Sequence, residues 1–189
     1  MIFSDRDIKK YLKSGRITVD PLVKEAIQPA SVDLRLDSEF MIFKHTSHAY
    51  IDVAEPVDEL MKKISISGRE PFVLHPGEFA LGLTFETVGV DDETVARLEG
   101  KSSLGRLGVI VHATAGFIDP GNCLKITLEL HNVGNLPVIL RYKMPIAQVA
   151  FQPLSSKAER PYGSKKLKSK YYKSKGIVMS QMHKNFKKK

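Results

Sequence analysis

The sequence has a single cysteine, Cys123, so no disulfide can form within one chain. It also lacks an apolar run of the length that crosses a membrane. Its first ten residues, MIFSDRDIKK, mix acids and bases where a secretory signal would have an apolar block. These absences favour a cytoplasmic protein with no membrane partner. At 189 residues, 42% of them apolar, the chain suits one domain with a sizeable core.

Basic residues are concentrated towards the C-terminus. Residues 155–189 hold twelve of the 29 Lys and Arg residues and a single acid, Glu159. The first 154 residues therefore carry seventeen basic and twenty acidic residues, a net charge of −3. We expect a folded body over residues 1–154 and a basic tail over 155–189 that is mobile when no ligand is bound.

Short alternating segments separated by turn residues dominate the body. Residues 32–36 and 124–130 alternate apolar and polar side chains, which is the period of a strand with one buried face. A capping pattern at Ser4 and a stop at Gly15 predict one short helix. We also expect strands at 40–43, 95–98, 109–111, 138–140 and 146–151, a hairpin of 72–74 with 79–86, a loop at 44–56 and a helical turn at 59–64. Without an internal repeat, this pattern predicts an all-β sandwich or jelly-roll-like barrel.

Two glycine-containing turns between residues 99 and 131 carry groups that suit a phosphate-bearing ligand. The first turn offers hydroxyls, cations and closely approaching backbone N–H groups, from Gly100, Lys101, Ser102, Ser103, Gly105 and Arg106. The second turn, 116–121, has Asp119 at its tip. Thr127 and Glu129 then share the polar face of the following strand.

Each of these groups also has an ordinary structural interpretation. A Lys-Ser-Ser turn is often only a turn, Asp is favoured before Pro-Gly, and a strand-face Glu is usually solvated. The Lys-rich tail is also usually solvated, although its aromatic residues Tyr162, Tyr171, Tyr172 and Phe186 leave nucleic-acid binding as a rival function. The acidic body argues against that rival. Taken together, the turns and carboxylates favour a nucleotide or sugar-phosphate site.

The segments EGKSSLGRLG, HATAGFIDPG and ITLEL resemble the dCTP deaminase family, which shares its fold with the trimeric dUTPases. The likeness extends to SDRDI, QPASVDLRL, FVLHPGEFALG, RPYGS and SKY, and so covers nearly the whole chain. The resemblance implies a distorted jelly-roll or β-barrel of dUTPase-like type. It also implies a homotrimer with active sites between subunits, a C-terminal tail that closes over the nucleotide, and dTTP as a candidate inhibitor.

The resemblance further implies a hydrolase that deaminates dCTP without zinc. This agrees with the sequence, because one cysteine and six histidines without ligand spacing cannot supply the zinc site of many deaminases. Glu129 would take a proton from water attacking C4 of cytosine and pass one to the leaving ammonia. Ser102 and Arg106 would lie beside this water. Asp119 would hold the deoxyribose 3′-OH and, as in dUTPases, activate water for phosphate hydrolysis.

The remaining expected substrate contacts come from the same resemblance. Lys101, Ser102, Ser103 and Arg106 would meet the triphosphate and the catalytic water, and Thr127 would flank the base. The full set of expected substrate-binding residues is Lys101, Ser102, Ser103, Leu104, Gly105, Arg106, Asp119, Thr127, Leu128, Glu129, Gln148, Tyr162, Lys170 and Ser174. Mg²⁺ would arrive on the triphosphate rather than at a protein metal site.

Two departures and one branch point affect the expected specificity. Asn122 stands where relatives usually carry an aromatic residue, and Ser174 stands where they often carry Gln. Asn122 therefore bears on deoxyribose selection, and Ser174 bears on tail closure. Gly116 and Phe117 resemble the residues at these positions in the branch of the family that forms dUMP directly. A glycine there leaves room for the phosphates of the substrate and for a second water. The alternative is deamination alone, giving dUTP; dUTP hydrolysis alone fits poorly with Glu129 and Arg106.

Overall fold

The computed structural model describes residues 1–44 and 48–186, and most of its regular structure is β-strand. Its helical elements are α1 (Asp5–Lys13), the single turn α2 (Ser102–Gly105), and the 3₁₀ turns η1 (Lys24–Ala26), η2 (Asp58–Leu60) and η3 (Met182–Asn185). Its strands are β1 (Ile17–Asp20), β2 (Val32–Arg35), β3 (Glu39–Phe43), β4 (Met61–Ser65), β5 (Phe72–Leu74), β6 (Phe79–Val90), β7 (Thr94–Gly100), β8 (Val109–Ile110), β9 (Phe117–Ile118), β10 (Cys123–Asn132), β11 (Val138–Leu140) and β12 (Pro145–Pro153).

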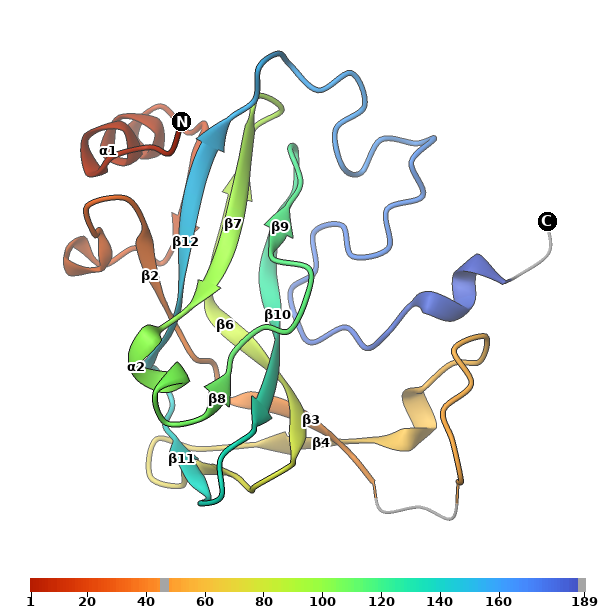
Figure 1. The fold of residues 1–189 in the computed structure, drawn as a ribbon. Helices are drawn as coiled ribbons and strands as arrows, with labels where there is room; N and C mark the ends of the chain where they lie inside the picture. The colour runs from red at the N-terminus through yellow and green to blue at the C-terminus, as the bar shows by residue number, and fades with distance from the viewer. Residues whose placement is uncertain (45–47, 187–189) are drawn as a thin grey trace.

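The strands form antiparallel sheets around one core (Figure 1). The largest sheet follows the order β4-β3-β6-β10-β8, and β1 pairs with β6. A second sheet follows the order β2-β12-β7-β9, and β11 pairs with β5 in a small third sheet. The prediction of an all-β, jelly-roll-like fold with a short N-terminal helix is therefore confirmed, and the described strands stay in separate sheets instead of closing one barrel.

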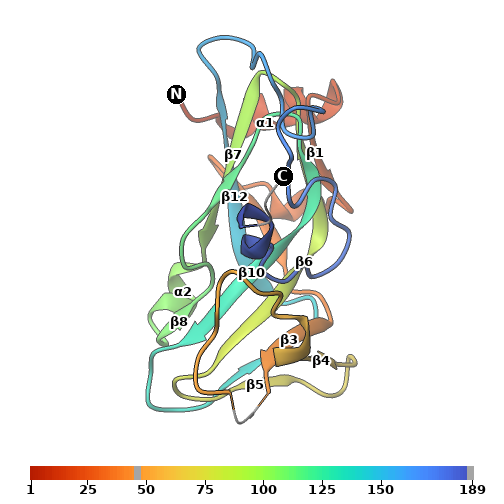
Figure 2. The ribbon, with the colours of Figure 1, turned by 90° about the vertical axis from the view of Figure 1, so that its right-hand side faces the viewer.

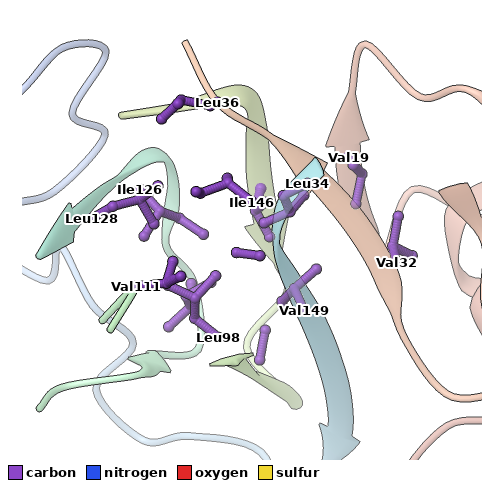
Figure 3. Packing of buried hydrophobic residues seen from close by; sticks show 14 of the residues in the cluster. Val19, Val32, Leu34, Leu36, Leu98, Val111, Ile126, Leu128, Ile146 and Val149 are labelled. Atoms are coloured by element: carbon purple, nitrogen blue, oxygen red, sulfur yellow. The ribbon is translucent and has the colours of Figure 1, made fainter. Parts of the chain in front are cut away.

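Strand β10 has one face in the core and one face outside it. Ile126, Leu128 and Leu130 are buried, whereas the polar residues between them are only partly buried. Figure 3 shows Leu34, Ile146 and Val149 on the other side of the same core. A fully buried leucine such as Leu128 contributes about 2–5 kcal/mol when compared with alanine. This packing fixes which side chains of β10 point out of the core.

The helix α1 begins and ends as the sequence predicts. The side chain of Ser4 accepts a hydrogen bond from the Asp7 backbone N–H, and the Asp7 carboxylate accepts one from the Ser4 backbone N–H. This reciprocal capping satisfies two of the free N–H groups of the first turn. Ile8 is fully buried on the inner face of the helix, and Gly15 follows the helix with a positive φ of 72°.

The predicted hairpin of residues 72–74 with 79–86 is wrong. β5 pairs with β11, with Val73 opposite Ile139. β6 has no free edge for β5 at this point, because Leu81 lies between Met41 of β3 and Glu129 of β10. The turn after β5 therefore carries the chain from one sheet to another.

Two further local predictions need correction. The helical turn expected at 59–64 is a strand over most of its length, because β4 pairs with β3 and places Ile64 opposite Phe40. The buried strand expected at 109–111 is the two-residue strand β8, in which Ile110 is 40% exposed. The expected loop at 44–56 has no helix or strand over residues 48–56, and residues 45–47 lie outside the described residues.

The tail crosses the outer side of β10. The Lys125 N–H donates to the Ser174 carbonyl (2.8 Å), and the Val178 N–H donates to the Thr127 hydroxyl (3.5 Å). Figure 2 shows the tail and η3 in front of β10. Mobility of the free tail stays a prediction.

Candidate active site

A cavity of about 790 Å³ lies on the outer face of β10. Its wall is built from β10, the segment 112–119, the segment 51–61 and the tail. The volume is within the range of small-molecule sites. The sequence-predicted residues among those lining it are Gly116, Phe117, Asp119, Thr127, Glu129, Tyr162 and Ser174.

Glu129 points into this cavity from the polar face of β10. Its Oε2 atom accepts a hydrogen bond from the Ala113 backbone N–H at 3.0 Å. The side chain is 29% exposed and lies 4.0 Å from the Nδ1 atom of His112. One carboxylate oxygen is therefore held by the protein while the group stays open to a ligand.

His112 is a cavity residue to which the sequence pattern gave no role. Both of its ring nitrogens are buried and have no hydrogen-bond partner within the described residues. Its only sequence signal is its place directly after the buried Val111, inside the HATAG segment. It supplies the ring that faces the Glu129 carboxylate.

Asp119 follows β9 and lies on the cavity wall as a free carboxylate. In the described part of the chain its side chain makes no hydrogen bond or ion pair. Nearby protein atoms replace part of its surrounding water, and this partial burial raises the pKa of Asp119 above its usual value. A raised pKa makes the carboxylate a better proton acceptor than an ordinary aspartate.

The turn after Asp119 is fixed by close packing against the start of the tail. Gly121 has a positive φ of 84°, and a Cβ atom there would lie 2.7 Å from the Cβ atom of Pro161. Asn122 is buried, and its Oδ1 atom accepts hydrogen bonds from the N–H groups of Cys123 (2.9 Å) and Lys173 (3.4 Å). Asn122 therefore joins the Asp119 turn to the tail, a link that the sequence did not indicate.

Gly116 also has a packing role, beside the room for phosphates and water that the sequence suggested. A Cβ atom at this position would lie 2.8 Å from the carbonyl oxygen of Leu98 in β7. The Leu98 N–H also donates to the Gly116 carbonyl at 2.8 Å. The glycine therefore lets the segment pack directly on β7, and any side chain would push this segment off the sheet. Phe117 is 64% exposed at the cavity wall.

The phosphate-suited turn does not line this cavity. Lys101 donates to Asp33 Oδ2 at 2.8 Å, and Ser102 begins the single turn α2. In the residues that the structure describes, the side chains of Ser102, Ser103 and Arg106 are exposed and make no hydrogen bond or ion pair. Figure 1 shows α2 on the opposite side of the sheets from the tail. The turn thus presents free donors to a different surface.

The other expected substrate residues divide in the same way. Gln148 of β12 lies next to the phosphate-suited turn, because its neighbour Ala147 is paired with Gly100. Leu104 and Leu128 are buried in the core, so only their backbone atoms can face a ligand. Tyr162 and Ser174 reach the cavity, and Lys170 lies between them in the chain without lining it.

The tail residues at the cavity are held by their own hydrogen bonds. The Tyr162 hydroxyl accepts from the Tyr171 N–H (3.2 Å), and the Tyr162 N–H donates to the Pro120 carbonyl (2.8 Å). The Ser174 hydroxyl donates to the Tyr171 carbonyl (2.8 Å). Tyr171, Lys125 and Val178 also line the cavity, although no local pattern in the sequence indicated them.

A family model described as dCTP deaminase-like matches residues 2–154. The chain belongs to this family. It is 51% identical over 186 residues to a protein of Mycobacterium sp. (strain KMS), and the match covers 98% of each chain. It is 53% identical over 192 residues to a protein of Dictyoglomus thermophilum, covering 100% of this chain and 98% of that one. Both of these dCTP deaminase-like relatives are named dCTP deaminase, dUMP-forming.

The fold of the dCTP deaminase-like chain also matches a solved structure. The 2′-deoxycytidine 5′-triphosphate deaminase from Agrobacterium tumefaciens superposes with a TM-score of 0.63 at 21% identity. The match covers 79% of this chain and 47% of the other, which is the longer of the two. At this identity the match supports the fold alone, and the chemistry has to be argued from the residues of the site.

The described residues of this dCTP deaminase-like chain include neither a membrane-spanning helix nor a cluster of metal ligands. No helix among them is both long and apolar enough to cross a membrane. No group of three or more His, Cys, Asp or Glu side chains among them is arranged to hold a metal ion.

Proposed function

We propose that the chain converts dCTP and two water molecules to dUMP, ammonia and diphosphate. The observation that carries this proposal is the presence of two carboxylates, Glu129 and Asp119, on the wall of one cavity, each open to a ligand. Two hydrolytic steps each need a group that accepts a proton from water. The names of the relatives at 51% and 53% identity support the same pair of steps.

Glu129 is the proton shuttle for the deamination step. It takes a proton from a water whose oxygen attacks C4 of cytosine, and it returns a proton to the amino group that leaves as ammonia. The Ala113 N–H holds one carboxylate oxygen, so the other oxygen is available to the water. A positioned acid–base group of this kind contributes about 10²–10⁴-fold to the rate.

Asp119 acts on the sugar and on the second water. Its carboxylate binds the deoxyribose 3′-OH and draws a proton from the water that attacks the α-phosphorus, and diphosphate leaves. The burial that raises the pKa of Asp119 suits it to this step.

A second copy of the chain completes the site. Among the described residues that line the cavity, Lys125 is the one Lys or Arg, which is too few for a triphosphate. Further donors lie on another surface: Lys101, Ser102, Ser103, Arg106 and Gln148. In a homotrimer, the donors of one subunit would meet the cavity of the next, which places Ser102 and Arg106 beside the water. Exposed apolar side chains near this surface support an interface there: Leu107, Ile110, Val133, Leu136 and Ile139.

The C-terminal tail and magnesium both contact the triphosphate of the substrate. Residues 155–189 close over the nucleotide, with Tyr162, Lys170 and Ser174 as contacts, and Mg²⁺ enters as part of the substrate complex. The nucleotide dTTP offers the same sugar and triphosphate and is therefore the candidate inhibitor. The lone Cys123 favours the cytoplasm for this reaction.

Product analysis tests the proposal. The full chain is incubated with dCTP and Mg²⁺, and the nucleotides are separated by anion-exchange chromatography. We expect dUMP to form at the rate of dCTP loss. Accumulation of dUTP would instead support deamination alone, and unchanged dCTP would refute both activities.

A further inference from the structure

Ser31 makes a hydrogen bond to a side chain far away in the sequence. Its hydroxyl donates to the Oε1 atom of Gln148 at 3.1 Å. The two residues are 117 positions apart and meet because β2 and β12 are neighbours, with Asp33 of β2 opposite Gln148. Both side chains are partly buried. Ser31 belongs to the QPASVDLRL segment, in which no residue has so far been given a role.

The backbone holds Ser31 in place. The Gln28 N–H donates to the Ser31 carbonyl at 2.8 Å, and Ile27 forms a β-bridge with Val32. Val32 is fully buried. The Ser31 hydroxyl is therefore attached to a fixed point at the start of β2, and its position defines the position of the group that it binds.

In this hydrogen bond Oε1 is the end of the Gln148 amide that faces Ser31. A glutamine side chain has one acceptor oxygen and one donor NH₂ group. Because Oε1 is bound to the Ser31 hydroxyl, the NH₂ group is directed away from Ser31. No acceptor for Nε2 is found among residues 1–44 and 48–186. The free end of Gln148 is thus the NH₂ donor, which can bind a phosphate oxygen. In the reversed orientation the free end would be the amide oxygen, which would repel the phosphate oxygen.

A second side chain on the same face of β2 holds the neighbouring cation. Asp33 accepts the Lys101 ammonium at 2.8 Å, and Ser31 and Asp33 share a face because side chains alternate along a strand. Lys101 follows Gly100, which is paired with Ala147. The amide donor and the ammonium therefore belong to one cluster, and both are held from β2.

We propose that Ser31 is a positioning residue for the triphosphate, because its hydroxyl fixes the Gln148 amide with the NH₂ group towards the phosphate oxygens. This inference rests on the proposed function and goes beyond it, since it assigns a role to a residue that does not touch the substrate. The phosphate groups keep the same charge in the transition state in which water attacks C4. A contact to them therefore stabilises the bound substrate and this transition state equally. Loss of a phosphate contact should therefore raise KM and leave kcat of deamination nearly unchanged.

The test compares Ser31→Ala with matched variants of the full chain. Ser31→Thr keeps the hydroxyl and serves as the rescue. Ser38→Ala removes another partly buried hydroxyl, one that bonds Asp37 at 3.3 Å, and serves as the control. Steady-state kinetics with dCTP are combined with calorimetric binding of inorganic tripolyphosphate, which reports the phosphate site without the chemistry. Ser31→Ala is also measured in a Gln148→Ala background.

We expect Ser31→Ala to raise KM and the tripolyphosphate dissociation constant about three- to tenfold, the effect of one neutral hydrogen bond. Ser31→Thr and Ser38→Ala should match the intact chain, and Ser31→Ala should add almost nothing when Gln148 is already alanine. Unchanged tripolyphosphate affinity in Ser31→Ala, or a full effect in the Gln148→Ala background, would overturn the inference. Failure of the intact chain to consume dCTP would refute the proposed function alone, because the tripolyphosphate comparison would still decide the role of Ser31.

Discussion

The Oε2 atom of Glu129 lies 3.0 Å from the backbone nitrogen of Ala113 and 4.0 Å from Nδ1 of His112. A backbone donor is fixed by the fold, so it holds the carboxylate without the entropy loss of ordering another side chain. β10 supplies the carboxylate, and the segment after β8 supplies the donor. The geometry of the proposed proton shuttle therefore depends on two elements that meet only in the folded chain.

Glu129→Gln should abolish deamination and keep the fold and dCTP binding. The amide has nearly the shape of the carboxylate but cannot accept the proton of the attacking water. We expect ammonia release to fall by about 10²-fold or more, measured by a coupled ammonia assay, with dCTP affinity measured by calorimetry. Glu39→Gln, which removes the partner of Lys63 on the surface of β3, is the control. Ammonia release near that of the intact chain would show that Glu129 is not the shuttle.

Asp119→Asn should abolish dUMP formation and slightly stabilise the fold near neutral pH. Burial raises the pKa of Asp119 above 3.8, so the folded chain binds more protons than the unfolded chain between the two pKa values. The free energy of unfolding of the intact chain therefore falls as pH rises through that window. Asn removes this penalty, which is small because the carboxyl is open to the cavity.

Thermal melts of the intact chain and Asp119→Asn across the acidic range provide the measurement. The variant should melt higher near neutral pH, and the difference should close as the pH falls through the folded-state pKa of Asp119. An intact chain that is more stable than the variant at neutral pH would show that the ionised carboxylate has a stabilising partner.

Removal of the tail after Gly163 should raise the KM for dCTP by about tenfold or more and slow the chemistry. The tail lines the cavity through Tyr171, Ser174 and Val178, and loss of one hydrogen bond to a charged group costs about 1.5–3 kcal/mol. Closure also excludes water from the site. Removal of Lys187–Lys189 alone is the control and should change little. Steady-state kinetics at fixed ionic strength would refute tail closure if both truncations behaved like the intact chain.

Zinc-selective chelation should leave deamination unchanged, and removal of magnesium should slow turnover. Glu129 carries the water chemistry in this mechanism, and magnesium arrives only with the triphosphate. Metal analysis of the purified chain accompanies the assay. One tightly bound zinc per chain, with activity in proportion to it, would contradict the assignment of Glu129.

The sequence predicts best those elements whose signal is local. The alternation of 124–130 identifies β10 and the outward direction of Glu129, because a period of two leaves one face for the core. The capping pattern at Ser4 likewise identifies α1. Each of these two patterns lies within one short stretch of sequence, so it can be recognised without knowledge of the rest of the fold.

Pairings between distant segments are what the sequence does not predict. The partner of β5 is β11 and not the adjacent β6, because β6 is already flanked on both edges. His112 contacts Glu129, and Asn122 contacts the tail. No local pattern in the sequence predicts either contact. The sequence singles out Gly116 for substrate space, but its contact with Leu98 depends on a strand that no local pattern connects to it.

The most direct measurement is the fate of labelled dCTP in the presence of a large excess of unlabelled dUTP. The purified chain is incubated with Mg²⁺ and both nucleotides, and dUMP, dUTP, ammonia and diphosphate are quantified over time. We expect labelled dUMP and ammonia in equal amounts from the first turnovers, with at least as much diphosphate and no label in the dUTP pool. Label accumulating in dUTP, or ammonia release without diphosphate, would contradict direct formation of dUMP from dCTP by this chain.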